Sequence, residues 1–200
     1  MILVIATTNP GKIREIEAIL TGVPVELRAL AAFPDLQEPE ETGTTFAENA
    51  RLKALYYAAA IGLPCVADDS GIEIAALDGL PGVHSARWEG EDYAVKFAKI
   101  RERLDAKGLE TSAARFVCRV AMADAARVVF ESEGVVEGTI ARAARGTHGF
   151  GYDPIFYYPP FGRTLGEVPR DEKATISHRG KAFRALRDFL VSANRIPAGS

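Results

Sequence analysis

The stretch LPCVADDSG, residues 63–71, decides how this chain is organised. It begins as an apolar run typical of a buried strand and then reaches two adjacent carboxylates, Asp68 and Asp69, followed by Ser70 and Gly71. Turn-forming residues after an apolar run indicate the end of a strand. We therefore expect the strand to cover residues 64–68 and a second short extended segment to follow at residues 72–76.

If the strand persists through both carboxylates, their side chains point to opposite faces, because successive side chains of a strand alternate. They are then no side-by-side acid/base pair, and one of them can face a site. Carboxylates at the end of an α/β strand suit Mg²⁺, which prefers oxygen ligands and neutralises phosphates. Glu40 and Glu41, in a separate acidic cluster, are candidates for further oxygen ligands. A simple hydrogen-bonding turn is the alternative.

The segments around this stretch alternate between strand and helix patterns. Thr45 and Glu48 fit a capping box, which marks the start of a long helix. The short connection near Asp124 favours a hairpin between two longer strands. The order of elements predicts an α/β domain with a mixed sheet. Helices are expected from residue 12 to Gly22 and over 46–61, 93–104 and 178–191, and strands over 2–6, 64–68, 72–76, 113–123 and 128–140.

Length and composition favour one domain. Two hundred residues with 48% apolar content can bury one sizeable core, so we expect a single two-lobed domain over residues 1–193 and a frayed tail over 194–200. No apolar run approaches the roughly 20 residues of a membrane span, and the start lacks a basic leader, so a cytoplasmic protein is expected. Cys65 and Cys118 are expected to be reduced core residues. The net charge of −3 argues against a nucleic-acid partner.

The segment TTNPGK, residues 7–12, lies between an expected strand and helix. Backbone N–H groups and the positive end of a helix dipole favour an anion there, and Lys12 adds a charge. The residue after Lys12 is Ile13 rather than Ser or Thr, so the general phosphate-loop motif does not apply. An ordinary helix-entry turn is the alternative. The candidate phosphate contacts are Thr7, Thr8, Asn9, Pro10, Gly11 and Lys12.

Three further features suit a nucleotide. Asn49 and Lys53 fall one turn apart on a helix face, which favours either a phosphate pocket or a lysine that reaches water. His178 and Arg179 are cations in a first helical turn, where they oppose the dipole; this indicates a site or else a tolerated surface pair. The loop GFGYD, residues 149–153, offers an aromatic ring for a purine and a carboxylate for ring N–H groups, unless the ring is simply buried.

Taken in order, these motifs closely resemble the inosine triphosphate pyrophosphatase family, whose members act on non-standard purine nucleoside triphosphates. The resemblance runs from residue 2 to about residue 190, with one departure, Thr8, where Gly is common. The matching segments are TTNPGK (7–12), EETGTTFAENARLKA (40–54), ADDSG (67–71), LPGVHSAR (80–87), GFGYDP (149–154) and EKATISHRG (172–180).

The resemblance implies Mg²⁺-dependent hydrolysis of dITP, ITP and XTP between the α and β phosphates, which yields a monophosphate and pyrophosphate and cleans the nucleotide pool. It also implies an elongated mixed sheet flanked by helices, two lobes with an active-site cleft between them, and a homodimer. Small purine nucleotides are the implied partners, with no nucleic acid and no membrane.

The same resemblance implies residue roles. Asp69 matches the catalytic base and metal carboxylate, with Glu41 or Glu40 as a loop ligand and Asp68 in support. Residues 7–12 and Lys53 would hold the triphosphate, and Ser70 would contact substrate. The base contacts would come from Phe150, Gly151, Tyr152, Asp153, Lys173, His178 and Arg179.

Hydrogen-bond chemistry suggests how the purine base would be selected, and two other functions remain as alternatives. Donors from His178 or Arg179 to a 6-keto group would favour hypoxanthine and xanthine over adenine, whose 6-amino group is itself a donor. A Maf-like nucleotide pyrophosphatase is the nearest rival enzyme, and a nucleotide sensor without turnover is a rival of another class. The role of residues 84–87 stays open.

Overall fold

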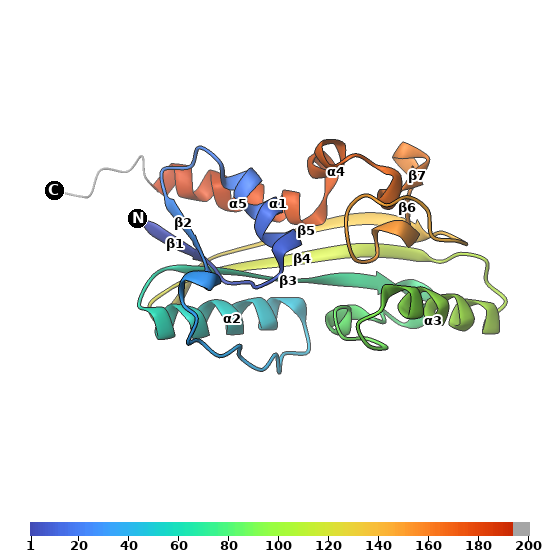
Figure 1. The fold of residues 1–200 in the computed structure, drawn as a ribbon, viewed down its shortest axis with the longest axis horizontal. Helices are drawn as coiled ribbons and strands as arrows, with labels where there is room; N and C mark the ends of the chain where they lie inside the picture. The colour runs from blue at the N-terminus through green and yellow to red at the C-terminus, as the bar shows by residue number, and fades with distance from the viewer. Residues whose placement is uncertain (194–200) are drawn as a thin grey trace. The chain divides into compact units, whose positions relative to one another are not determined.

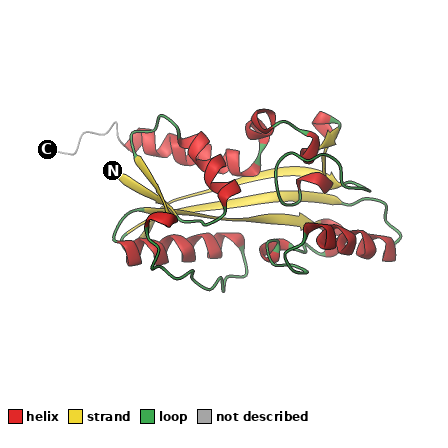
Figure 2. Ribbon diagram, viewed as in Figure 1, coloured by secondary structure: helices red, strands yellow, loops and turns green. Residues whose placement is uncertain are grey.

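The computed structural model describes residues 1–193, which form a seven-stranded mixed sheet with five α-helices (Figures 1 and 2). The predicted α/β class is therefore confirmed. None of the helices in this part of the chain is long and apolar enough to span a membrane. The strands are β1 Ile2–Ile5, β2 Glu26–Ala29, β3 Cys65–Ile74, β4 Ala113–Asp124, β5 Arg127–Ile140, β6 Phe156–Tyr158 and β7 Arg163–Thr164; the helices are α1 Pro10–Leu20, α2 Phe46–Ile61, α3 Tyr93–Ala106, α4 Arg170–Ile176 and α5 His178–Ala193.

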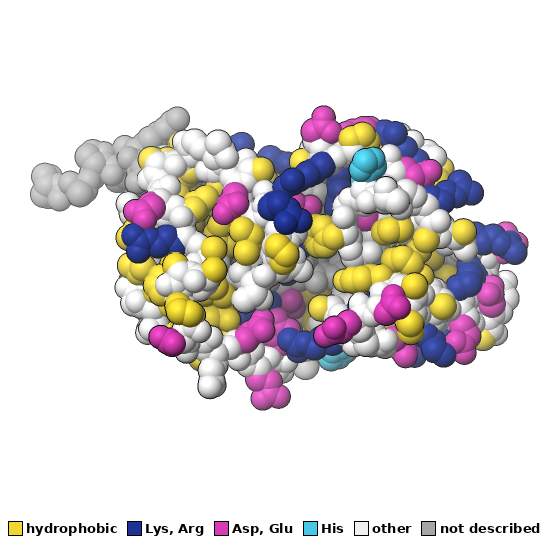
Figure 3. Space-filling view, in the orientation of Figure 1, with side chains coloured by type: hydrophobic (Ala, Val, Ile, Leu, Met, Phe, Trp, Pro, Cys, Tyr) yellow, Lys and Arg dark blue, Asp and Glu magenta, His cyan; other side chains and the backbone are white. Residues whose placement is uncertain are grey.

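The strands are hydrogen-bonded in the order β2-β1-β3-β4-β5-β6-β7. β1 pairs in parallel with β2 and β3, whereas β6 pairs antiparallel with β5 and β7. Only two residues connect the neighbouring strands β4 and β5, so the predicted hairpin is confirmed. On the face seen in Figure 3, basic and acidic side chains are interspersed.

The described chain divides into two compact units. The first unit contains Met1–Asp69, Cys118–Gly134 and the chain from His178, and the second contains Ser70–Val117 and Val135–Ser177. β3, β4 and β5 contribute residues to both units. The tail that was expected to fray, residues 194–200, lies outside the described residues.

In the first unit, α1 and α5 cover one face of the sheet and α2 covers the other (Figure 1). The side chains of β3 alternate between these layers. Val66 packs in the cluster that contains α1 and α5, whereas Cys65 and Ala67 pack in the cluster that contains α2. Cys65 and Cys118 are free and buried, as predicted. The same alternation sets the directions of the two carboxylates that follow.

The second unit has its own core. Ile72 and Ile74 of β3 pack with Ile100 and Leu104 of α3 and with Phe156 of β6, and each of these side chains is almost completely buried. α3 therefore presents an apolar stripe to this core, as the helical spacing predicted.

β3 differs from its prediction, and the difference matters for function. The strand runs over ten residues to Ile74, so the predicted end at Asp68 is wrong. Ser70 and Gly71 favour turns by composition, but here they pair within the sheet. A Cβ at Gly71 would collide with the Ser85 hydroxyl and lie 2.6 Å from the Gly82 carbonyl oxygen, so this position serves close packing and not a turn. The pattern did not predict four short elements, β2, β6, β7 and α4.

Candidate active site

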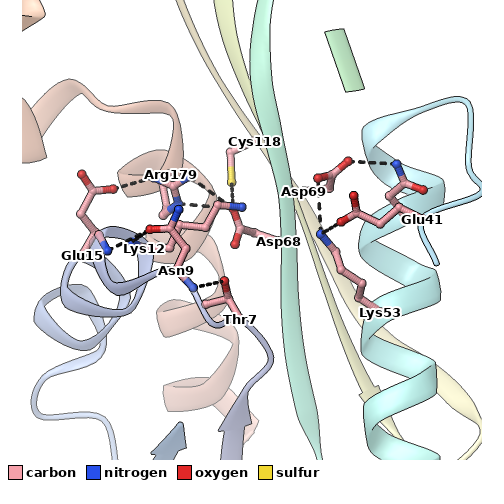
Figure 4. Close-up of polar contacts among 12 residues, drawn as sticks. Thr7, Asn9, Lys12, Glu15, Glu41, Lys53, Asp68, Asp69, Cys118 and Arg179 are labelled. Atoms are coloured by element: carbon pink, nitrogen blue, oxygen red, sulfur yellow. Dashed lines mark hydrogen bonds and ion pairs between the residues drawn. The ribbon is translucent and has the colours of Figure 1, made fainter. Parts of the chain in front are cut away.

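Asp68 and Asp69 are neighbours on β3, and their side chains point to opposite faces (Figure 4). Asp68 lies on the side of α1 and α5, and Asp69 lies on the side of α2. Both are buried, with 2% and 6% of their surface exposed. One metal ion therefore cannot be held by both side chains, and Asp68 is removed from the predicted metal ligands.

Asp68 is the centre of a buried charge cluster. Its Oδ2 lies 2.9 Å from Nζ of Lys12 and 3.3 Å from Nε of Arg179, and Arg179 also contacts Glu15 at 2.7 Å. The Cys118 thiol donates to the same oxygen at 3.7 Å. Burial alone would raise the pKa of Asp68, but Lys12 and Arg179 outweigh it and hold this pKa well below its usual value. The cluster keeps Asp68 ionised and joins α1, β3 and α5.

The α1 entry loop is capped by its own side chain. Asn9 Oδ1 accepts from the N–H groups of Gly11, at 2.9 Å, and Lys12, at 3.2 Å. These amides were expected to face an anion, but Asn9 already satisfies them. Thr7 in turn accepts from the Asn9 N–H at 3.2 Å. Thr8 is exposed and makes no hydrogen bond within residues 1–193, and Pro10 is exposed at the first turn. The Lys12 ammonium of this loop is paired with Asp68.

On the other face, Asp69 lies against α2. Asn49 Nδ2 donates to Asp69 Oδ2 at 3.2 Å, and Lys53 Nζ lies 3.4 Å from Asp69 Oδ1 and 2.6 Å from Glu41 Oε1. The capping box of Thr45 and Glu48 sets where α2 begins and hence where its Asn49–Lys53 face points. Lys53 is only 7% exposed, so the alternative of a lysine that reaches water is wrong.

The charges around Asp69 are less completely balanced than those around Asp68. Burial raises the pKa of the Asp69 carboxyl above its usual value; Lys53 and Lys12 oppose the rise, and the nearby Glu41 adds to it. Asp69 and Glu41 both contact the ammonium of Lys53. The sequence left Glu40 and Glu41 open as the metal ligand of this loop, and the contacts favour Glu41. Glu41 contacts Lys53, whereas Glu40 is exposed and makes no ion pair in the described chain.

The oxygens of Asp69 and Glu41 fit a magnesium ion. They converge on one cationic point, the Lys53 ammonium, and two carboxylates are what Mg²⁺ typically takes from a protein when substrate phosphates supply further ligands. Within the part of the chain that the structure describes, no group of three or more His, Cys, Asp or Glu residues forms a metal cage.

The start of α5 is buried. His178 and Arg179 are 6% and 2% exposed, so the alternative of a surface pair is wrong. Gly134 of β5 allows this approach, because a Cβ there would collide with the His178 carbonyl oxygen. The guanidinium of Arg179 is engaged with Asp68 and Glu15, which makes it a charge partner in the cluster and removes the support for its predicted contact with the base.

The aromatic loop belongs to the second unit. The Asp153 carboxylate accepts from the Phe150 N–H at 2.8 Å and from Lys173 Nζ at 2.6 Å. The Lys173 ammonium lies 5.0 Å from the centroid of the Phe150 ring, and 36% of Phe150 is exposed. Gly149 has a φ of 74°, and a Cβ there would collide with the Asp153 carboxylate. Phe150 is therefore presented at the surface by a fixed turn.

Three other predicted contacts differ in exposure. Tyr152 is 4% exposed, and its ring packs in the core of the second unit. Ser70 and Gly151 are half-buried. Sequence reasoning missed Glu15, although it lies three residues after Lys12 on α1, a spacing that brings side chains together on a helix.

Known proteins resemble this chain in sequence and in fold. The model of the Ham1 family matches residues 3–189. A dITP/XTP pyrophosphatase of Exiguobacterium sp. strain AT1b is 47% identical over 193 residues, which cover 96% of this chain and 97% of that protein. Among solved structures, a HAM1 protein from Coxiella burnetii has a TM-score of 0.89 at 40% identity, with 96% of this chain and 99% of that chain covered.

A second solved structure, the nucleoside-triphosphatase or dITP/XTP pyrophosphatase of Mycobacterium abscessus, has a TM-score of 0.75 at 39% identity and covers 93% of this chain and 98% of its own. The fold and the site together are those of a nucleotide-handling α/β protein. The chain belongs to the Ham1 family, and the resemblance expected from its motifs is confirmed.

Proposed function

We propose that this chain hydrolyses dITP, ITP and XTP at the α–β bond and releases the nucleoside monophosphate and pyrophosphate. Removal of these nucleotides would keep hypoxanthine and xanthine out of DNA and RNA. The observation that carries the proposal is the pair Asp69 and Glu41, whose carboxylates meet at Lys53 on one face of β3. The Exiguobacterium relative, a dITP/XTP pyrophosphatase, supports the substrate class.

The first unit would bind the triphosphate and the metal ion. Lys12 and Lys53 supply positive charge, and the exposed Thr8 supplies an unused hydroxyl and amide. Asp69 and Glu41 would hold Mg²⁺, which neutralises phosphate charge and so favours attack at phosphorus. Before substrate arrives, the buried Lys53 ammonium offsets part of the negative charge of the two carboxylates.

Asp69 would also act as the general base. A base works best when its pKa lies near the working pH, and burial moves the pKa of Asp69 in that direction. It would orient a water and take its proton as the water oxygen bonds to the α phosphorus. The bond from that phosphorus to the bridging oxygen then breaks, and pyrophosphate leaves with that oxygen.

The second unit would recognise the base. Phe150 offers an exposed ring for stacking, and Asp153 and Lys173 form an acceptor and donor pair beside it. Lys173 is this unit's candidate donor to a 6-keto group. His178, in the first unit, keeps the donor role that the resemblance implies, whereas the guanidinium of Arg179 is engaged in the charge cluster. Selection by the 6-keto group would separate hypoxanthine and xanthine from adenine.

The decisive experiment is a product assay with and without Mg²⁺ on dITP, XTP, ATP, GTP and dTTP. We expect monophosphate and pyrophosphate from dITP and XTP, with much slower turnover of the other three. Orthophosphate as the product, or equal turnover of all five, would contradict the proposal. Binding without turnover would identify a nucleotide sensor instead.

The metal role is tested in the same assay with two neighbouring variants. Glu41→Gln removes a carboxylate that contacts Lys53, and Glu40→Gln removes an exposed one. Loss of a supporting partner of a metal ligand already costs about tenfold in affinity, so Glu41→Gln should raise the Mg²⁺ concentration for half-maximal rate by at least about tenfold. Glu40→Gln should leave it unchanged. Equal effects would remove Glu41 from the site.

We also propose a cytoplasmic homodimer, because the resemblance implies a dimer and the nucleotide pool that it would clean is cytoplasmic. Light scattering of the purified protein tests the oligomeric state directly.

A further inference from the structure

Lys96 of α3 is a buried lysine that the proposed reaction does not use. It is 0% exposed, and its ammonium donates to the carbonyl oxygens of Ser85, at 3.1 Å, and Ala86, at 2.5 Å. Within the described residues, no carboxylate lies within ion-pair distance of it. A buried charge without a counterion is costly, so a residue of this kind needs a reason beyond the filling of volume.

Two aromatic rings surround the ammonium. Nζ of Lys96 lies 4.8 Å from the ring centroid of Tyr93 and 6.0 Å from that of Tyr152, and the two rings meet edge to face at 5.3 Å. Ring faces attract a cation, which offsets part of the burial cost. Burial lowers the pKa of Lys96, and Glu91 opposes this shift. Even a neutral amine keeps two N–H donors for the two carbonyl oxygens.

Ser85 connects this lysine to the aromatic loop. Its carbonyl oxygen accepts a second hydrogen bond from the Tyr152 hydroxyl at 2.8 Å, and its Oγ accepts from the Ile72 N–H of β3 at 3.0 Å. Tyr152 directly precedes Asp153, the residue that holds the Phe150 N–H. A continuous set of contacts therefore runs from Lys96 through Ser85 and Tyr152 to the Phe150 turn, entirely inside the second unit.

We propose that Lys96 is a positioning residue that fixes the Phe150 loop through the Ser85 carbonyl and Tyr152, and thereby sets the discrimination between purine bases. The inference rests on the proposed stacking of the base on Phe150. It also gives a role to the 84–87 segment, which supplies the carbonyl oxygens that Lys96 binds. Lys96 itself, being buried, contacts no substrate.

The test compares two lysines of the same helix. Lys96→Met keeps the length of the side chain and removes its donors, whereas Lys99→Met changes a lysine whose side chain is 43% exposed and paired with Glu102. Loss of hydrogen bonds from a charged donor should raise KM for dITP about tenfold and lower the ratio of kcat/KM for dITP over dGTP. The kcat for dITP should stay within about twofold. Lys99→Met should match the parent protein.

Tyr152→Phe provides an independent variant, because it removes only the hydroxyl that donates to Ser85. We expect the same changes in KM and selectivity, and a less than additive effect when it is combined with Lys96→Met, since both groups donate to one oxygen. If Lys96→Met does not fold, Tyr152→Phe alone decides the question by its effect on selectivity.

Two results would overturn the inference. If Lys96→Met and Tyr152→Phe lower the melting temperature but leave KM and the dITP to dGTP ratio unchanged, the contacts are only structural. Phe150→Ala separates this failure from that of the proposed function. If Phe150→Ala leaves selectivity unchanged, the base-stacking role fails and this inference fails with it; if it lowers selectivity while the other variants do not, only the inference fails.

Discussion

Asp68 and Asp69 lie on one strand, yet their carboxylates meet different charged partners on the two faces of β3 (Figure 4). Asp68 meets two cations, Lys12 and Arg179, and its pKa is held low by them against the effect of burial. Asp69 shares the ammonium of Lys53 with Glu41, and burial raises the pKa of Asp69. The pKa values of two adjacent aspartates are therefore shifted in opposite directions by the layers that the side chains face.

This difference in charge environment suits Asp68 to stabilising the fold and Asp69 to taking part in the proposed reaction. A carboxylate that is fully matched by cations joins elements of the fold and is a poor base, because its proton affinity is low. A buried carboxylate that is incompletely matched costs stability in its charged form, but it is available to a metal ion or a water proton. The comparison thus predicts opposite results for the same Asp→Asn change at the two positions.

The largest effect should come from Asp69→Asn. Loss of a general base typically lowers turnover by about 100-fold to 10,000-fold, and we expect kcat for dITP to fall within that range. The free energy of unfolding measured in urea without metal should not fall at neutral pH, because the amide removes a carboxylate whose charged form the fold disfavours. Asp124→Asn, at the exposed end of β4, is the control. Full activity in Asp69→Asn would contradict the assignment of Asp69 as the general base.

Asp68→Asn should act mainly on stability. The substitution leaves the ammonium of Lys12 and the guanidinium of Arg179 without their shared carboxylate, and the loss of one partner from a buried ion pair costs about 3–5 kcal/mol. Urea unfolding of the variant and the parent protein gives this difference directly. A loss below about 1 kcal/mol would mean that the cluster is not the joint between α1, β3 and α5 that its contacts indicate.

The pH dependence of stability should differ in sign between the two positions, by at most about 1.4 kcal/mol per pH unit for each proton. Because the folded pKa of Asp68 is lowered, its contribution is present above the unfolded pKa of about 3.9 and is lost as the pH falls below that value. Because the folded pKa of Asp69 is raised, its contribution is present below about pH 3.9 and is lost as the pH rises through the folded pKa.

Unfolding free energies between pH 3 and pH 7 therefore test the comparison most finely. Asp68→Asn should reduce the fall in unfolding free energy on acidification. Asp69→Asn should remove the rise in unfolding free energy that protonation of Asp69 gives on acidification. If both variants change the slope in the same direction, the two faces of β3 do not differ in the way their charges indicate.

Local sequence patterns predicted much of the fold. The start of α2 was predictable because Thr45 and Glu48 satisfy each other's backbone donors without help from elsewhere in the chain. The hairpin of β4 and β5 was predictable because its connection is too short for a crossover. The end of β3 was mispredicted, because the reason for Gly71 lies in Ser85, a residue distant in sequence that packs against it.

For the site, the sequence by itself determined that Asp68 and Asp69 would face opposite ways if one strand held both, since alternation is a property of any strand; the longer β3 of the structure met that condition. It also placed Asn49 and Lys53 on one face of α2, because helical spacing is equally local. Only the tertiary structure decided which carboxylate faces which charges. It paired Arg179 with Asp68, placed Glu41 rather than Glu40 against Lys53, and buried Lys96 with its ammonium on the Ser85 carbonyl oxygen, since these contacts join segments whose meeting no local pattern encodes.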